Sequence, residues 1–335
     1  MRKNHYIVMV DGSSYLPMYQ QMLWDISKRN DVSILVDSPD HKRSIDILLK
    51  SKVQKISRGH LDFLAYEKGI LYECLERMCP VNDNVYVLFL NSALWYHPYL
   101  AGTLQRYKKR WPNIKYILYY LDVVGAGVSR VADYLQSKKI FDLVYSYDAA
   151  DAERYQFIPW NTIYSKTADA SSISPETQLY FCCGVTKARI PILEECLSQC
   201  QHNQIDCRMD LVCNEPAEQL RKYASMANLL KSGEVLPYPK VLQRQLQAHC
   251  MLEIVQPGRT NLTLRPYEAV AYNRKLLTNS KSILSFKYYN PEFMQYFENI
   301  EDIDWQWVKH PVAVDYNYKE DFSPSLLLND LSQRL

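Results

Sequence analysis

Short apolar runs alternate with segments of helical periodicity along most of the chain. In the first half, continuous apolar runs predict strands at 5–10, 32–36, 85–90, 116–121 and 143–147. Between them, apolar residues recur at helical spacings, as at Tyr15, Tyr19 and Met22. Because strands that are apolar on both faces are typical of parallel sheets covered by helices on both sides, this half predicts a doubly wound α/β domain.

The alternation stops at a small, polar, proline-containing segment and then restarts. Such a composition is typical of a linker, which we place at 166–178. Further strands are predicted at 179–183, 207–213, 234–236, 252–255 and 275–278, with helices that include 218–230 and 241–250. The predicted organisation is an N-terminal domain 1–165, the linker, a C-terminal domain 179–290, and a partly helical tail 291–335. Packing of this tail on the N-terminal domain is one arrangement that we consider.

Composition narrows the class of protein. A length of 335 residues suits two domains, and a net charge of +2 does not favour a nucleic-acid partner bound by charge alone. The nine cysteines form no C-x-x-C pair, which predicts reduced thiols in the cytoplasm and no zinc site. No apolar stretch approaches the length of about 20 residues that spans a membrane. We therefore expect a soluble, cytoplasmic protein, with peripheral contact at the inner membrane face left open through the basic and aromatic segment 106–111.

In doubly wound sheets, ligands bind beyond the carboxyl ends of the strands. After the strand predicted at 252–255, a polar loop leads into a helix that we expect to begin at Pro266, with Glu268 in its first turn and Asn273 in the left-handed conformation at its end. The hydrogen-bond donors of this loop suit a phosphate, and the single carboxylate, that of Glu268, suits a ribose diol. A capped helix without a ligand remains the alternative. The loop and its flanks contain Gln256, Gly258, Asn261, Thr263 and Arg265.

Basic residues also follow the first strand of the second predicted domain. Gly184 and Thr186 are followed by Lys187 and Arg189, which open a helix. Cations in a first turn oppose the helix dipole and cost about 0.3–1 kcal/mol unless an anion is bound. The segment therefore predicts an anion site.

These segments resemble the donor-binding region of GT-B glycosyltransferases. Pro266, Glu268, Ala269, Ala271 and Asn273 occupy the places of the Pro-hydrophobic-Glu-Ala motif and of its helix-ending residue. This chain also has Gln256, Gly258 and the Leu-Thr-hydrophobic-Arg sequence of 262–265 before the motif. In this it is similar to bacterial enzymes of capsule and lipopolysaccharide synthesis. The segment 119–160 resembles the end of the N-terminal domain in the same enzymes, through residues that include Asp122, Phe141, Asp142, Tyr145, Asp148 and Asp151.

The resemblance implies two Rossmann-like domains that face a central cleft. It implies that Glu268 holds the donor ribose, that Arg265 and Thr263 lie near the phosphates or the sugar, and that Gly184, Lys187 and Arg189 contact the diphosphate. Many retaining enzymes carry another Glu where this chain has Thr260, so the stereochemistry stays open.

An inverting transferase also needs a general base within about 2.6–3.2 Å of the acceptor hydroxyl. The candidates are Asp11 at the end of the first strand, His97 and Asp122, and the sequence does not choose among them. We expect no metal and no permanently bound cofactor, because GT-B enzymes as a class stabilise the leaving diphosphate with basic residues and dipoles. The donor would be a UDP-, GDP- or CMP-sugar.

The sequence thus predicts a metal-independent transferase of a hexosyl or related sugar to a hydroxyl of a growing surface polysaccharide or lipid-linked glycan. One alternative is a non-catalytic GT-B-like module that binds a sugar nucleotide or a glycan. Another is a dinucleotide-dependent oxidoreductase, since Gly125 and Gly127 follow a strand and Asp148 lies about 20 residues further on. Arg130, in the place of the third glycine, argues against it because a large side chain obstructs close packing of helix and strand.

Overall fold

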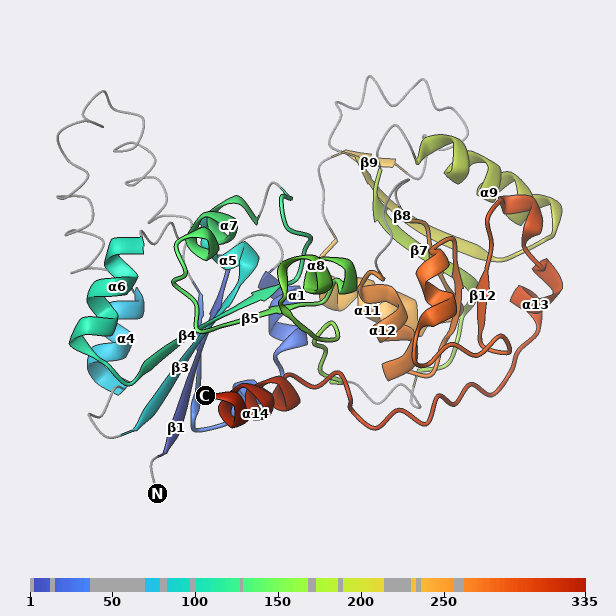
Figure 1. Cartoon of the computed structure of the whole chain (residues 1–335). Coiled ribbons are helices and arrows are strands. Elements are labelled where there is room, and N and C mark those ends of the chain that lie inside the picture. The colour runs from blue at the N-terminus through green and yellow to red at the C-terminus, as the bar shows by residue number, and fades with distance from the viewer. Residues whose placement is uncertain are drawn as a thin grey trace. The chain divides into compact units, whose positions relative to one another are not determined.

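The computed structural model describes residues 3–12, 16–36, 70–78, 83–96, 101–126, 129–167, 173–185, 189–213, 230–232, 236–255 and 262–335. The chain divides into two units (Figure 1). The first consists of Met1–Ser165 together with Phe322–Leu335, and the second of Lys166–Asp321. Both are α/β units with parallel sheets, which confirms the fold class predicted from the alternation of apolar runs and helical periods.

The sheet of the first unit has the strand order β2-β1-β3-β4-β5-β6, and all its described pairs are parallel. Its strands are β1 Asn4–Val10, β2 Val32–Val36, β3 Asn84–Leu90, β4 Ile114–Tyr120, β5 Leu143–Ser146 and β6 Ile158–Pro159. The central strands are almost wholly buried because their side chains are apolar on both faces. The chain reverses its direction across the sheet between β1 and β3, so the carboxyl ends of these two strands form a topological switch point.

Helices on the first sheet bury the apolar stripes that the sequence shows. Leu71 and Leu75 of α4 and Leu104 and Tyr107 of α6 join the core cluster of β1, β3 and β4. The last helix, α14, also belongs to this unit, where Tyr145 donates a hydrogen bond to Asp330 at 2.7 Å. The helices are α1 Leu16–Met22, η1 Ile26–Lys28, α4 Ile70–Met78, α5 Asn91–Tyr96, α6 Ala101–Arg110, α7 Arg130–Ser137, α8 Ala149–Tyr155 and α14 Pro324–Arg334.

The sheet of the second unit has the order β12-β11-β10-β7-β8-β9, again with parallel pairs. Its strands are β7 Thr177–Gly184, β8 Cys207–Cys213, β9 Leu230–Ser232, β10 Ala248–Glu253, β11 Lys275–Thr278 and β12 Met294–Tyr296. Its helices are α9 Ile190–His202, α11 Tyr238–Leu246, α12 Leu264–Ala271, η5 Lys281–Ser285, η6 Ile300–Asp302 and α13 Trp305–Lys309. Here the switch point lies between the carboxyl ends of β7 and β10.

The segment 291–335, which the sequence predicted to be one tail, is divided between the two units. Residues up to Asp321 belong to the second unit, and only Phe322–Leu335 belongs to the first. Strand β12 extends the second sheet, and Phe297, Ile300 and Trp305 pack into a core cluster with α9. The apolar residues of this segment recur at neither strand nor helix spacing, since they are carried by short 3₁₀ turns and a five-residue helix.

Two further boundaries differ from the sequence prediction. The helix expected at 241–250 ends at Leu246, and β10 begins at Ala248, because Cys250 and Met251 are paired with β7 on one side and β11 on the other. The strand expected at 234–236 is instead β9, at Leu230–Ser232, within the segment expected to end a helix. Residues 233–235 and most of the predicted helix 218–230 lie outside the described residues.

Within the described ranges, no helix has both the length and the apolar character needed to cross a bilayer. The cysteines whose side chains the structure describes are free thiols: Cys74, Cys182, Cys183, Cys196, Cys200, Cys207 and Cys250.

Candidate functional site

The two carboxyl strand ends at the switch point of the second unit carry polar residues. Strand β7 ends at Gly184 and β10 at Glu253, and the two strands pair in parallel with Met251 opposite Tyr180. Helix α12 follows β10 and begins just beyond this edge. Because ligands of doubly wound sheets bind outside the carboxyl ends of the strands at such a point, this edge is the candidate site of the second unit.

Helix α12 starts two residues earlier than the sequence suggested. Thr263 is its N-cap, with extended backbone and a side-chain oxygen that accepts from Arg265 N at 3.2 Å. Leu264 is therefore the first helical residue and Pro266 the third, where a missing N–H still costs no intrahelical bond. Glu268 consequently lies beyond the first turn, where the helix dipole has little effect. Its charge must be stabilised by other groups. At the far end Asn273 has φ 50°, the predicted left-handed conformation.

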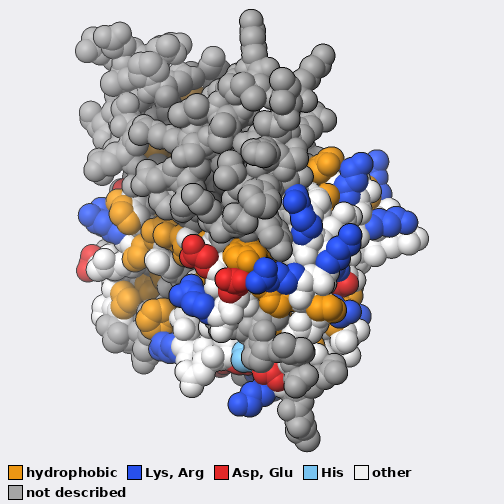
Figure 2. Space-filling model, turned by 90° about the vertical axis from the view of Figure 1, so that its left-hand side faces the viewer, with side chains coloured by type: hydrophobic (Ala, Val, Ile, Leu, Met, Phe, Trp, Pro, Cys, Tyr) orange, Lys and Arg blue, Asp and Glu red, His pale blue; other side chains and the backbone are white. Residues whose placement is uncertain are grey.

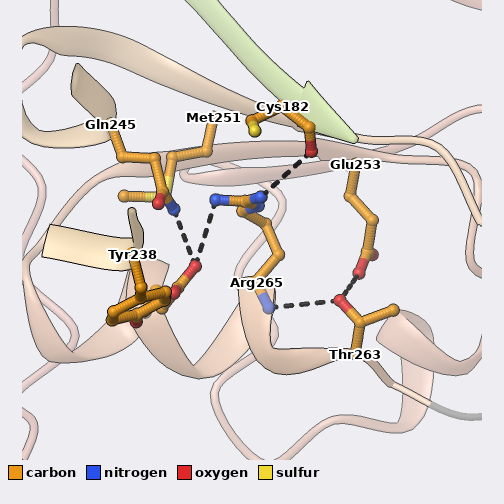
Figure 3. Close-up of polar contacts among 8 residues, drawn as sticks. Cys182, Tyr238, Gln245, Met251, Glu253, Thr263 and Arg265 are labelled. Atoms are coloured by element: carbon orange, nitrogen blue, oxygen red, sulfur yellow. Dashed lines mark hydrogen bonds and ion pairs between the residues drawn. The ribbon is translucent and has the colours of Figure 1, made fainter. Parts of the chain in front are cut away.

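Arg265 and Glu268 form a buried ion pair on this helix (Figure 3). Arg265 Nη1 lies 3.1 Å from Glu268 Oε2, and their side chains are 15% and 3% exposed. Gln245 Nε2 donates to the same oxygen at 2.7 Å, and Tyr238 Oη donates to Oε1 at 2.5 Å. Burial lowers the pKa of Arg265, but the charge of Glu268 and neighbouring groups outweighs this and leaves the pKa raised. The guanidinium is therefore charged throughout the physiological range.

The same guanidinium reaches β7. Arg265 Nη2 lies 3.5 Å from the carbonyl oxygen of Cys182, two residues before Gly184 (Figure 3). Nearby, Asp210 of β8 accepts from Tyr180 Oη at 2.9 Å and from Arg244 Nη1 at 2.5 Å. The carboxylates of Asp210 and Glu268 thus each have their own arginine. Arg265 joins the α12 side of the switch point to the β7 side, and its charge is already balanced.

Glu253 is a buried carboxylate at this edge that the sequence analysis did not single out. Thr263 Oγ1 donates to its Oε1, and Thr278 Oγ1 donates to its Oε2 at 2.5 Å. Thr278 in turn accepts from Ser280 N at 3.0 Å. Burial raises the pKa of Glu253, while the two threonines and Arg265 act in the opposite direction. An acidic residue within an apolar run is the signal by which the sequence could have revealed it.

The anion segment after β7 is described only at its ends. Thr186 and Lys187 lie outside the described residues, as do Gln256, Gly258 and Asn261 of the other loop. Arg189 immediately precedes the 13-residue helix α9, and its Nη1 donates to the carbonyl oxygen of Gly184 at 2.9 Å. Its Nε is buried and has no hydrogen-bond partner among the described residues. The space that a Cβ would take at Gly184 is open, so a ligand can approach the backbone there.

In the first unit, two of the three candidate bases are described. Asp11 follows β1 at the switch point and is 1% exposed, whereas Asp122 is half-buried and accepts from Val123 N at 3.0 Å. His97 lies outside the described residues. Asn91, at the end of β3, is 1% exposed and is committed to Leu121 N and Ser129 Oγ, so it holds the ends of β3 and β4 together.

In the described part of the glycine loop after β4, residues 122–126, the backbone N–H groups are bound by carboxylates. The N–H groups of Val123, Val124 and Gly125 donate hydrogen bonds to the carboxylates of Asp122, Asp151 and Asp133, respectively. A pyrophosphate needs such N–H groups free and is repelled by carboxylates. At residues 122–126, the described part of this loop before Gly127, these N–H groups are therefore not available to a phosphate.

Asp148, the acidic residue of that alternative, is an N-cap. Its Oδ1 accepts from Asp151 N at 2.6 Å, and its own backbone is extended. We expect Asp148→Ala to lower the free energy of unfolding by about 1 kcal/mol, and Asp148→Ser to restore most of the loss, because serine also caps helices. Urea denaturation of the three proteins checks this. A loss equal in both variants would show that Asp148 does not act as a cap.

The basic residues at the end of α6 are largely paired. Lys108 lies 2.7 Å from Asp142, and Arg110 lies 2.5 Å from Glu76. Figure 2 shows basic, acidic and hydrophobic side chains interleaved on this face of the molecule. Peripheral membrane contact through the 106–111 segment stays a prediction. In the second unit, the basic residues Arg274 and Lys275 donate to backbone carbonyl oxygens.

No protein-family model and no curated protein matches the chain. Solved structures do. An α-glucosyltransferase in complex with UDP and a 13-mer DNA containing an A:G mismatch has a TM-score of 0.59 and 10% identity over 98% of both chains. A glycosyltransferase from Rickettsia africae ESF-5 has a TM-score of 0.56 and 11% identity over 99% of this chain and 97% of that one. A putative UDP-N-acetylglucosamine 2-epimerase from Listeria monocytogenes has a TM-score of 0.52 and 9% identity, covering 100% and 97%. At such identities the likeness shows the fold alone, which is that of the GT-B glycosyltransferases.

Proposed function

We propose that this chain is a glycosyltransferase that takes a sugar from a nucleotide-sugar donor bound at the switch point of its second unit. The observation that carries the proposal is the buried Arg265–Glu268 pair, which spans from α12 to the carbonyl of Cys182 on β7. A charged pair whose carboxylate is buried is expensive, and its place at the edge where doubly wound sheets bind ligands supports a binding role. Two of the solved structures that share this fold are glycosyltransferases by name, which also supports the proposal.

Within this proposal the donor is held by both sides of the edge. Glu268 receives the ribose, and Arg265 lies beside it. Gly184, Lys187 and Arg189 receive the diphosphate at the N-terminus of α9, where the helix dipole also favours an anion. Thr263 acts by capping α12, because its hydroxyl is already committed to Glu253. We assign the remaining donor contacts to Thr186, Gln256, Gly258 and Asn261, which belong to the same two segments of the sequence.

The proposed reaction needs no metal. The acceptor oxygen attacks the anomeric carbon, the bond from that carbon to the diphosphate oxygen breaks, and the nucleoside diphosphate leaves with the electron pair. For a CMP-sugar the leaving group is the monophosphate. Lys187, Arg189 and the α9 dipole stabilise the charge of the leaving group. The proton of the acceptor hydroxyl passes to a base of the first unit, for which Asp11, His97 and Asp122 are the candidates.

The acceptor that we propose is a hydroxyl of a growing surface polysaccharide or of a lipid-linked glycan, with the protein in the cytoplasm. The resemblance of the 119–160 and 251–280 segments to capsule and lipopolysaccharide enzymes supports this choice. The DNA in the α-glucosyltransferase complex is a ligand of that protein. The net charge of +2 gives no reason to expect a nucleic-acid acceptor here.

The first test is a thermal-shift screen of UDP-, GDP- and CMP-sugars beside NAD. A donor at 100 times its Kd adds about 2.7 kcal/mol of stability, so a true ligand gives a clear shift. Release of nucleoside diphosphate in the presence of an acceptor then separates a transferase from a module that only binds. Asp11→Asn, His97→Gln and Asp122→Asn identify the base: the variant that loses turnover but keeps donor binding carries it. Stabilisation by NAD alone would contradict the proposal.

A further inference from the structure

The carboxylate of Glu268 is already held by three donors of the protein. Tyr238 donates to Oε1. Gln245 and Arg265 both donate to Oε2, as the two dashed lines that meet at one oxygen in Figure 3 show. An ionised carboxylate offers about four acceptor positions in all. With the donors of the described residues counted, one position therefore remains, on Oε1. The side chain of Glu268 is only 3% exposed, so there is little room for a ligand to approach it from elsewhere.

Two of these donors come from one helix with a fixed start. Tyr238 is the first residue of α11 and lies between Pro237 and Pro239, whose rings restrict the backbone. Gln245 follows seven residues later, on the same face of the helix, and is wholly buried. Because the backbone is restricted there, Tyr238 could leave Glu268 only by rotation about its own side-chain bonds, with loss of its hydrogen bond to Oε1.

A ribose diol would offer two hydroxyls to a carboxylate that can accept one. Sites built to bind a substrate hydroxyl reject an analogue that lacks it by about 10⁴–10⁵-fold when a buried polar group is left unpaired. Here the loss of a ribose hydroxyl leaves no unpaired carboxylate oxygen, because Tyr238, Gln245 and Arg265 remain. The usual source of strong discrimination between ribose and deoxyribose is thus missing.

We propose that Tyr238 is a specificity-determining residue that lets the donor site accept nucleoside diphosphates of ribose and of 2′-deoxyribose alike. The inference rests on the proposed function, in which Glu268 meets the donor ribose. It adds deoxyribonucleoside diphosphate sugars to the donor class. If Tyr238 swung aside on binding, both hydroxyls would reach Glu268 and discrimination would be strong.

The test is calorimetric titration of the whole chain with UDP, GDP and their 2′-deoxy counterparts. We expect wild-type Kd values for the ribose and deoxyribose forms to differ by at most about tenfold, the effect of one hydrogen bond. Tyr238→Phe keeps the ring but frees the second position on Oε1, so its preference for ribose should rise at least tenfold above that of the wild type. Tyr134→Phe, at a tyrosine that is 49% exposed in the first unit, is the matched control and should change nothing.

The outcomes separate this inference from the proposed function. A wild-type protein that binds UDP or GDP but rejects the deoxy form by more than about a hundredfold overturns the inference and leaves the transferase proposal standing. So does a ribose preference that is identical in the wild type and in Tyr238→Phe. If no nucleoside diphosphate or nucleotide sugar binds the wild type, both are overturned.

Discussion

Arg265→Ala is expected to lower the free energy of unfolding by about 3–5 kcal/mol, because it leaves the Glu268 carboxylate buried without its cation. The same change removes the link from α12 to the Cys182 carbonyl, so nucleotide binding should be lost as well. Urea denaturation measures the first effect, and thermal shift with the best donor measures the second. Arg29→Ala is the matched control, because Arg29 pairs with Asp31 in a partly exposed position where an ion pair contributes at most about 1 kcal/mol.

A double-mutant cycle separates the charge pair from the loss of side-chain volume. Glu268→Gln removes the charge that Arg265 balances, so Arg265→Ala in that background should cost much less than in the wild type. The coupling energy between contacting residues typically reaches about 0.5–3 kcal/mol. If the two changes were simply additive, the ion pair would not be what holds this edge together.

Glu253→Ala is expected to cost about 3 kcal/mol of unfolding free energy, because it leaves the buried hydroxyl of Thr278 and the partly buried hydroxyl of Thr263 without their acceptor. Thr263 caps α12 and Thr278 accepts from Ser280 N, so both the start of α12 and the end of β11 should loosen. Glu253→Gln keeps one acceptor oxygen and should cost less. Donor affinity should fall in the same order, which titration with the best donor checks. Equal stability of wild type and Glu253→Ala would contradict the assigned contacts.

The raised pKa of Glu253 predicts the sign of a pH dependence. Because the folded protein binds this proton more tightly than the unfolded chain, the contribution of Glu253 to stability is fully present below its unfolded pKa. It is lost as the pH rises through its folded pKa. Glu253→Gln should remove this part of the pH profile. Denaturation of both proteins at a series of pH values checks it, and a profile that is unchanged by the substitution would show that Glu253 does not titrate in this way.

The architecture could be predicted from the sequence because buried parallel strands are apolar on both faces. Runs such as 32–36, 207–213 and 275–278 appear as strands with the predicted bounds. Where backbone pairing competes with side-chain periodicity, the prediction fails. The segment 248–250 continues the stripe of α11 in sequence but pairs with two neighbouring strands in the fold. Similarly, the short turns of 297–308 have no period that a sequence could reveal.

Only part of the candidate site could be predicted from the sequence. The polar loop before Glu268 pointed to this helix and included Arg265. The two residues lie three apart on one helix face only because α12 begins at Leu264, two residues before the expected start. The contacts of α12 with other elements could not be predicted. Tyr238, Gln245 and Glu253 become its neighbours only through the order of the strands in the sheet. Glu268 therefore looked like a lone carboxylate available to a ribose, whereas in the fold three donors already hold it.

Hydrogen exchange with and without the donor found by the thermal-shift screen tests the central claim most directly. We predict that the donor slows amide exchange in peptides covering 179–189 and 262–272, the two sides of the switch point in the second unit. Protection confined to peptides of the first unit, such as those around Gly125, with no change in 179–189 or 262–272, would contradict the assignment of the donor site.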